Sequence, residues 1–381
     1  MNLVYFVLFI ISLFGYQKSN NENPTLLDLS DALKSTSQIK SSKIVSRFEY
    51  IKLSSERNHM IGGSPKFYVN DSVIICISFK QIFLFDRKTG EFIKEIGEHG
   101  RGPNAYWATR SVGSVDFKNN VIYATAYNKL IGYSFDNKVI SSVDIPYEYK
   151  NTTPFNKNLF ASYIVNQSGD EKRRIILYDL KEKKIVKIFP NHQKYNKIKG
   201  KHRKLPYNES WFYKYDERLF FKEYLNDTLY EVKINKLEPR FVFKSGEFSP
   251  PYEDRETFQI TKYHYISNIF ENNNFLFFTL SFKKRNHWSI YDKKEGKCVV
   301  SNFKNKKKCG FKNDIDGFAE FRPLSINHYT NELVGYLSPL EIIEWFEKNP
   351  QLIKKLPTHL RNLKNINYTD NPVVMIAKLK E

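Results

Sequence analysis

Hydrophobic and polar residues alternate over short runs along most of the chain, and turn-forming residues separate the runs. The clearest case is Ile82–Tyr106, where two alternating runs flank Asp86-Arg87-Lys88-Thr89-Gly90. Aspartate can accept hydrogen bonds from the backbone just after it, and glycine adopts positive φ at no cost, so this segment is predicted to form a β-hairpin. The glycine- and proline-rich stretch 97–103 follows and predicts an irregular loop.

A weaker form of this pattern recurs downstream. An aromatic residue followed by an acidic one ends the corresponding runs, at Phe85-Asp86, Phe135-Asp136, Tyr178-Asp179, Tyr230-Glu231 and Tyr291-Asp292. Strand pairs are predicted before these positions, at 121–126 with 130–134, 159–165 with 174–178, 218–223 with 228–231, and 275–282 with 288–291. The acidic positions recur at steps of 43 to 61 residues. Such a period, with short strands in each unit, is typical of propeller blades.

Two strands far apart in the sequence lack a blade of their own. Phe48–Leu53 lies near the start of the pattern and Pro372–Leu379 at its end, so pairing them would close the ring without an open sheet edge. Ser338-Pro339-Leu340-Glu341 has the residues of a helix capping box and predicts a helical insertion over about 338–364. We expect one all-β, six-bladed propeller over 44–381.

The segment before the propeller is expected to direct export. Leu3–Phe14 is apolar except for Ser12, shorter than the roughly 20 residues that span a bilayer, and followed by a polar stretch. We interpret 1–16 as a signal-peptide-like segment and 17–43 as a polar tether with one helical turn. A buried N-terminal strand is the alternative for the apolar run. Tyr16 stands where a bacterial lipoprotein has its lipidated cysteine, which argues against a lipid anchor.

Composition agrees with an all-β protein, and charge adds a further hypothesis. Aromatic residues make up 16% of the chain, with 31 Phe and 25 Tyr, and such residues favour strands. The net charge is +19, and Lys181–Lys204 holds ten basic residues and one acid. This stretch could bind a polyanion or polysaccharide, with salt-sensitive retention on heparin as the consequence, or it could be an ordinary solvated surface. No nucleic-acid-binding motif accompanies it.

Cysteine and histidine do not form a recognisable metal motif. Cys76 lies in an apolar run, and Cys298 and Cys309 could pair in an exported protein. The eight histidines lack zinc-ligand spacing, so no metal and no cofactor are expected, with calcium left open. If the protein is an enzyme similar to metal-dependent propeller lactonases or lyases, its only candidate catalytic residues are Asp116, Asp316, His264 and His287. They are too dispersed to receive roles, and we expect no catalytic residue.

Several stretches resemble one known group of proteins. They are Phe48–Leu53, Phe85-Asp86 with Gly90 and Phe92, Gly100–Tyr106, Asn313–Gly317 and Asn371–Val374. From about residue 44 to its end, the chain is similar to the six-bladed β-propellers of exported bacterial proteins, which are distantly similar to NHL-repeat propellers. The resemblance implies an envelope protein without an established reaction. The chain departs from the group's pattern at Ala105, where Glu is frequent, and at Phe318, where Gly is frequent.

Loops that link one blade to the next are the expected ligand site, because they share one mouth of the central channel. Those loops are 97–110, 190–207, 249–265 and 313–323, and their candidate binding residues are His99, Arg101, Tyr106, Trp107, Arg110, Tyr252, Arg255, His264, Asp316 and Arg322. Aromatic faces beside guanidinium groups suit a sugar ring or an anionic group. Alternatively, Arg101 and Tyr106 brace their loop and Arg322 pairs with Asp316.

The function predicted from the sequence is therefore binding or scaffolding rather than catalysis. We expect a monomer in the periplasm or cell envelope, with an envelope protein or a carbohydrate as its partner. No specific nucleic acid is expected, and the membrane would be contacted at most through the N-terminal segment.

Overall fold

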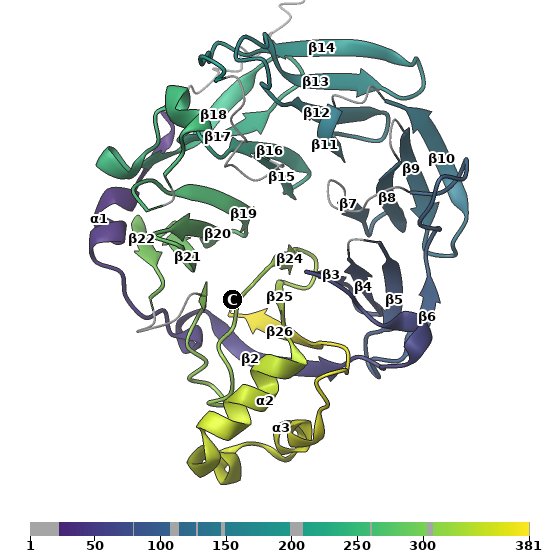
Figure 1. Ribbon diagram of the computed structural model, residues 1–381, viewed down its shortest axis with the longest axis vertical. Helices are drawn as coiled ribbons and strands as arrows, with labels where there is room; N and C mark the ends of the chain where they lie inside the picture. The colour runs from purple at the N-terminus through teal and green to yellow at the C-terminus, as the bar shows by residue number, and fades with distance from the viewer. Residues whose placement is uncertain are drawn as a thin grey trace, which may run out of the picture.

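Six small, mainly antiparallel sheets stand in a ring around one axis (Figure 1), as the computed structural model of the protein shows. The structure describes residues 23–78, 80–106, 114–126, 129–145, 149–198, 209–259, 261–302 and 308–380. The six-bladed propeller predicted from the sequence is confirmed. The signal-peptide-like segment 1–16 lies outside the described residues.

Blades 1 to 3 each contain four strands, which follow the chain from the innermost to the outermost. Blade 1 contains β3 (Lys66–Val69), β4 (Val73–Ile77), β5 (Ile82–Asp86) and β6 (Phe92–Glu95). Blade 2 contains β7 (Ser114–Asp116), β8 (Val121–Ala126), β9 (Lys129–Ser134) and β10 (Val139–Asp144). Blade 3 contains β11 (Tyr149–Pro154), β12 (Leu159–Ile164), β13 (Arg173–Asp179) and β14 (Lys184–Pro190).

Blades 4 to 6 carry additions to this plan. Blade 4 contains β15 (Ser210–Tyr215), β16 (Arg218–Glu223), β17 (Thr228–Val232), β18 (Leu237–Lys244) and, outside them, β1 (Thr25–Asp28). Blade 5 contains β19 (Tyr265–Glu271), β20 (Phe275–Phe282), β21 (Arg285–Asp292) and β22 (Lys297–Val300), with β23 (Lys308–Cys309) beside β21. Blade 6 contains β24 (Ser325–Asn327), β25 (Glu332–Leu337), β26 (Val373–Leu379) and β2 (Val45–Lys52).

The ring closes in blade 6 as predicted. Strand β2, from near the start of the chain, pairs antiparallel with β26 at its end, in a register that places Phe48 opposite Ala377. The buried Asn371 amide adds to the closure, because its Oδ1 accepts from the Ile61 amide (2.8 Å) and its Nδ2 donates to the Ser54 carbonyl (2.7 Å). Strands from the two ends of the chain therefore belong to one sheet, which joins the ring.

The hairpin that defines the repeat has the turn chemistry expected of it. Asp86 Oδ1 accepts hydrogen bonds from the backbone amides of Lys88 (2.9 Å) and Thr89 (2.8 Å). Gly90 has φ of +77°, and a Cβ there would lie 2.1 Å from the Lys52 carbonyl oxygen of the neighbouring blade. Glycine is thus required both by the turn and by the close packing of blade 1 on blade 6.

The segment 17–43, predicted to be a polar tether with one helical turn, forms an added strand and a short helix from Thr25 onward. β1 adds in parallel to β18, with Leu27 opposite Phe243, and α1 (Leu29–Lys34) follows directly. Backbone bridges then join Ser37 to Ser301 and Lys40 to Lys312, so the segment runs along the outside of the ring toward blade 6 (Figure 1). The buried side chains of Leu27 and Leu29 offset the entropy lost when the segment is ordered.

The helical insertion of blade 6 begins as the sequence predicts. The Ser338 hydroxyl accepts from the Glu341 amide (3.3 Å), and Glu341 Oε2 accepts from the Ser338 amide (3.1 Å). Between β25 and β26 the chain forms α2 (Pro339–Lys348), α3 (Thr358–Arg361) and the 3-10 turns Pro350–Lys355 and Asn362–Asn365. Further 3-10 turns are Ser41–Lys43, Arg57–His59, Gly246–Phe248 and Tyr252–Glu256.

The hydrophobic core lies between neighbouring blades. Ile75 of blade 1 packs in one cluster with Ile131 and Tyr133 of blade 2, for example, and Phe220 of blade 4 packs with Phe278 of blade 5. Cys298 of blade 5 is a free thiol, so the disulfide to Cys309 that the sequence leaves open is not formed. No helix among the described residues is long and apolar enough to cross a membrane.

Candidate functional site

Strand direction decides which loops share a face of the ring. Successive strands of each blade are antiparallel, so loops from an outermost strand to the next blade and loops between second and third strands lie on one face, called here the loop face. The described parts of the predicted linking loops belong to it. The turns between first and second strands, and between third and outermost strands, lie on the opposite face, called here the turn face.

The predicted binding residues in the loop after blade 1 lie partly in the core and partly on the surface. Tyr106 is fully buried between blades 1 and 2, and its hydroxyl donates to the Lys80 carbonyl oxygen (3.1 Å). Its backbone forms a bridge with His99, while Arg101 is exposed. Tyr106 thus braces its loop rather than facing a ligand. Trp107 and Arg110 lie outside the described residues.

Tyr252 and Arg255 are brought together, but in a closed network. The buried Arg255 guanidinium forms an ion pair with Glu209 and donates to the Tyr252 hydroxyl (3.1 Å). It also stands over the ring of Tyr195, 5.2 Å from the centroid. Breaking such a buried pair would leave an uncompensated charge, so this arginine holds the loop together.

His264 is a buried neutral histidine. Its Nε2 lies 2.7 Å from the Ser245 hydroxyl. Burial, and then the nearby charge of Lys222, lower the pKa of His264 to about 3. It is only 2% exposed and so does not face a ligand from solvent.

Asp316 and Arg322 do not pair with each other, so the pair predicted between them is not formed. Asp316 accepts from the Tyr50 hydroxyl (2.8 Å), whereas Arg322 forms an ion pair with Glu341 of the capping box (2.6 Å). Both side chains therefore attach surrounding segments to blade 6. The described members of the predicted set are spread around the loop face and do not form one site.

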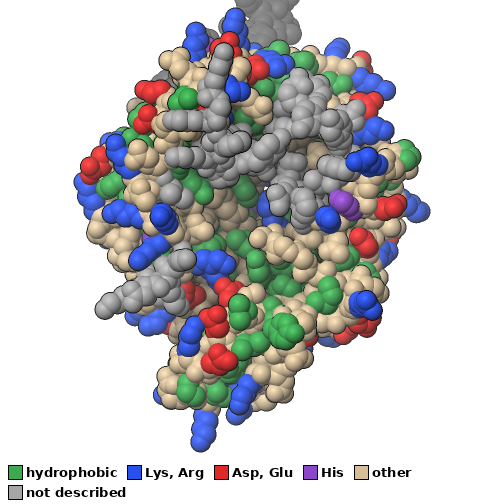
Figure 2. Space-filling model, in the orientation of Figure 1, with side chains coloured by type: hydrophobic (Ala, Val, Ile, Leu, Met, Phe, Trp, Pro, Cys, Tyr) green, Lys and Arg blue, Asp and Glu red, His purple; other side chains and the backbone are tan. Residues whose placement is uncertain are grey.

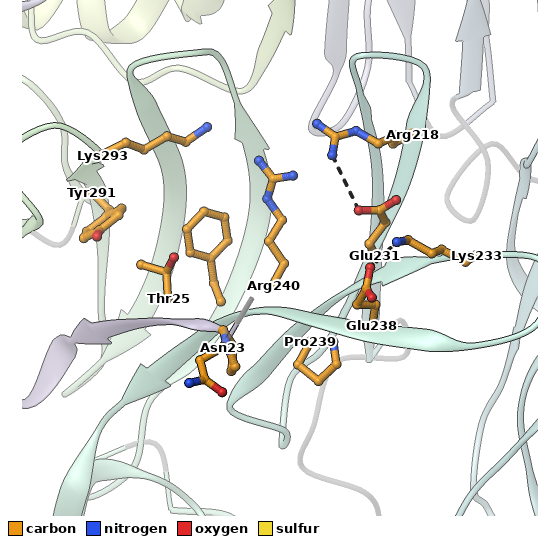
Figure 3. A pocket seen from close by; sticks show the side chains of 12 residues that line it. Asn23, Thr25, Arg218, Glu231, Lys233, Glu238, Pro239, Arg240, Tyr291 and Lys293 are labelled. Carbon is orange, nitrogen blue, oxygen red and sulfur yellow. Dashed lines mark ion pairs between the residues drawn. The ribbon is translucent and has the colours of Figure 1, made fainter. Parts of the chain in front are cut away.

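A polar cavity of about 520 Å³ lies instead between blades 4 and 5, beside the N-terminal segment (Figure 3). It is lined from blade 4, blade 5 and the lead into β1, by Asn23, Pro24, Thr25, Arg218, Glu231, Lys233, Glu238, Pro239, Arg240, Phe241, Tyr291 and Lys293. Arg218 begins β16 and Lys293 follows β21, which places the cavity toward the turn face. Its size falls within the usual range for small-molecule sites.

One buried carboxylate organises the inner wall of this cavity. Glu271, at the end of β19, is fully buried, and its Oε2 accepts from Arg240 (2.9 Å) and from Lys293 (2.5 Å). Its other oxygen accepts from the Tyr213 hydroxyl (2.8 Å). Two cations thus share one carboxylate whose two oxygens are both engaged.

Aromatic rings hold the cations of the cavity close to one another. The Arg240 guanidinium lies 4.5 Å from the ring centroid of Phe220, and the Lys293 amine lies 4.9 Å from that of Tyr215. Arg218 is 5.9 Å from the same Tyr215 ring and pairs with Glu231 at 3.6 Å. Burial lowers the pKa of Lys293, and the arginine charges add to that effect against the opposing influence of Glu271.

Sequence reasoning missed this cavity for an identifiable reason. Its cations come from β16, β18 and the turns after β17 and β21, and no local motif links them. The sign available in the sequence was the position of Arg218 and Lys293 beside predicted turns, whereas ligand binding was predicted at the linking loops. Charged residues beside turns are common on soluble proteins, so position alone could not single them out.

The described residues do not supply a catalytic constellation. They contain no group of three or more His, Cys, Asp or Glu side chains that could hold a metal ion. Asp116 accepts from the Asn119 amide (3.1 Å) within a turn, and His287 Nδ1 lies 2.6 Å from the Ser301 carbonyl oxygen. Together with His264 and Asp316, these enzyme candidates serve separate structural contacts.

The basic segment 181–204 is described only in part. Lys181, Lys183 and Lys184 are exposed at the turn before β14 and at its start, whereas 199–204 lie outside the described residues. Figure 2 shows Lys and Arg side chains spread around the rim of the face seen there, with Asp and Glu among them. Polyanion binding through this segment stays a prediction.

Comparison with known proteins gives a family and a fold. The model of a family described as "Domain of unknown function (DUF4934)" matches residues 24–378. A crystal structure described as that of a "Putative exported protein" from Bacteroides fragilis is similar with a TM-score of 0.71 and 15% identity, covering 94% of this chain and 100% of that one. At this identity the likeness shows the fold alone.

Two further results add nothing to the functional argument. A crystal structure described as "the eukaryotic initiation factor" gives a TM-score of 0.35 at 10% identity, covering 76% of this chain and 79% of that one, which is too low to support an inference. No curated protein matches the sequence. The distant likeness to NHL-repeat propellers stays a prediction.

Proposed function

We propose that this chain, which belongs to the DUF4934 family, is an exported, non-catalytic protein that binds a small ligand in the cavity between blades 4 and 5. The cavity is the observation that carries the proposal. It is concave and large enough for a small molecule, and its polar groups are held by ion pairs and aromatic contacts. Such a site is suited to recognition because its side chains are fixed before the ligand arrives.

Export is supported by two independent observations. The apolar run Leu3–Phe14 followed by a polar stretch has the pattern of an export signal. The Bacteroides fragilis protein that shares the fold over 94% of this chain carries "exported" in its description. The periplasm or cell envelope is the compartment we propose, with Tyr16 in place of a lipidated cysteine.

Binding is favoured over catalysis by the contacts of the candidate catalytic residues. A lactonase-like, metal-dependent activity would require carboxylates or histidines that converge on one point. Within the described part of the chain, Asp116, Asp316, His264 and His287 are instead engaged in turns, buried hydrogen bonds and loop contacts. A carbohydrate or another small molecule that is bound without being converted is therefore a better candidate for the cavity than an enzyme substrate.

Blocking the cavity tests the proposal. Thr25 is exposed and its side chain lies in the cavity (Figure 3), so Thr25→Trp should fill part of the space while leaving the β1 backbone pairing intact. We expect small molecules from a charged and neutral metabolite panel to raise the melting temperature of the wild type by a few degrees, and to lose that effect in Thr25→Trp.

Thr369→Trp is the matched control, because Thr369 is also exposed but lies in the loop before β26. It should bind like the wild type. If every compound that binds the wild type binds Thr25→Trp equally well, the cavity is not the ligand site and the proposal fails.

A further inference from the structure

We infer that the ligand of this cavity is a small hydroxylated anion, whose carboxylate or phosphate group is held by Arg240 and Lys293 with Arg218 beside them. This inference rests on the proposed function and adds the chemical class of the ligand. No single motif indicates it; it follows from the charges, the burial and the unused hydrogen-bonding capacity of the cavity wall.

The cavity has more cations than carboxylates. Four of its lining residues are basic and two are acidic, and Glu271 stands directly behind the wall. Lys233 and Lys236 both pair with Glu238, and Arg218 pairs with Asp216 as well as with Glu231. Arg240 and Lys293 are left with Glu271 alone, so the group carries one positive charge in excess.

That excess charge is partly removed from water. The side chains of Arg240 and Lys293 are 22% and 18% exposed, and Glu271 is fully buried. Charges in such surroundings are screened less than charges on the open surface, and they are stabilised by an additional partner. Both oxygens of Glu271 are already engaged, and a bound anion would supply the additional negative charge.

The donors needed to hold an anion are present. Among the described residues Arg240 donates one hydrogen bond, from Nη2 to Glu271, whereas a guanidinium carries five N–H donors arranged to bind a carboxylate or phosphate with two parallel bonds. In Figure 3, Arg218, Arg240 and Lys293 lie toward the same end of the cavity. An anionic group placed there would meet all three cations.

The rest of the cavity suits a ligand that carries hydroxyl groups on the part away from its anionic group. Asn23 and Thr25 lie away from that end and offer hydrogen-bond donors and acceptors (Figure 3). An anion with a purely apolar body would leave these polar groups without partners, which costs affinity. A sugar acid or a sugar phosphate satisfies both ends of the site.

Calorimetric titration of the whole protein tests the ligand class with three probes of similar size. Gluconate carries a carboxylate, glucose 6-phosphate carries a phosphate, and glucose carries no charge. We expect one or both anions to bind at least tenfold more tightly than glucose, with affinity that falls as NaCl increases. The stronger anion identifies the preferred group.

Lys293→Met is the diagnostic variant, because it removes the excess charge while Arg240 still pairs with Glu271. It should weaken anion binding at least tenfold, and Arg240→Gln, which leaves Lys293 on Glu271, should do the same. Arg47→Gln is the control, since Arg47 also pairs with a carboxylate but lies on the exposed strand β2 of blade 6.

The two proposals fail in different ways. If glucose binds as tightly as the anions, or if both cation variants leave anion affinity unchanged, the anionic class is overturned although the cavity still binds. If the anions bind and Thr25→Trp retains their full affinity, the site itself is overturned.

Discussion

Single buried polar residues fix the positions of loops and strand ends in this propeller. Asn371 joins the end of the chain to the segment that follows β2, and Arg255 joins the loop after blade 4 to Glu209 before β15. Each of these groups is costly to bury unless it is hydrogen-bonded, so removing one partner is more damaging than the bond alone suggests. Most of the described residues predicted to bind a ligand have such structural roles.

His264 should make the stability of the protein depend on pH. Its folded-state pKa of about 3 lies below the usual 6.5, so between these values the unfolded state binds a proton that the folded state does not. The stabilisation is present above pH 6.5 and is lost as pH falls toward 3, by about 1.4 kcal/mol per pH unit at most.

Urea unfolding of the wild type and of His264→Gln at pH 7, 6, 5 and 4 measures this contribution. The variant should lose less free energy of unfolding than the wild type as the pH decreases. Parallel curves for the two proteins would show that His264 titrates normally in the folded state.

Among the helices and strands, those predicted correctly depend on residues that lie close together in the sequence. The hairpin at Asp86–Gly90 and the capping box at Ser338 depend on residues a few positions apart, and both form as predicted. The predicted strand pairs follow from alternation over five or more residues. Strand β1 has four residues, too few to show a period, and it exists because the edge of β18 is there to receive it.

Leu27 should contribute strongly to stability through that added strand. Its side chain is fully buried among residues of blades 4 and 5, so Leu27→Ala should reduce the free energy of unfolding by about 3 kcal/mol. Leu26→Ala is a control on the same strand, because Leu26 is 51% exposed, and it should change stability by less than about 0.5 kcal/mol. Chemical denaturation of both variants makes the comparison.

Equal effects of the two substitutions would contradict the burial of β1. Such a result would favour the tether predicted from the sequence over the added strand. A large effect of Leu27→Ala alone would show that the segment is an integral part of blade 4.

At the scale of the whole molecule, ring closure was predictable and the site was not. Six repeats and two unpaired terminal strands permit one closed arrangement, which is the one observed. The cavity depends on how blades 4 and 5 face each other and on where β1 and the residues just before it lie against them. No local sequence pattern predicts either feature. Arg218, Arg240 and Lys293 are brought together by the fold alone.

The cavity lies on the side of the ring opposite to the loops that were predicted to bind a ligand. Asn23 and Pro24, directly before β1, line the cavity together with residues at the turns of blades 4 and 5. The linking loops and the helical insertion lie on the loop face, on the other side of the ring. A ligand in the cavity would therefore leave the loop face open to a second partner.

The most direct test of the central claim is a crystal structure of the protein soaked with the anion that binds most tightly in the titration. We expect density for the ligand between blades 4 and 5, with its carboxylate or phosphate within hydrogen-bonding distance of Arg240 and Lys293. Density for the ligand on the loop face, with the cavity between blades 4 and 5 unoccupied at saturating concentration, would contradict it.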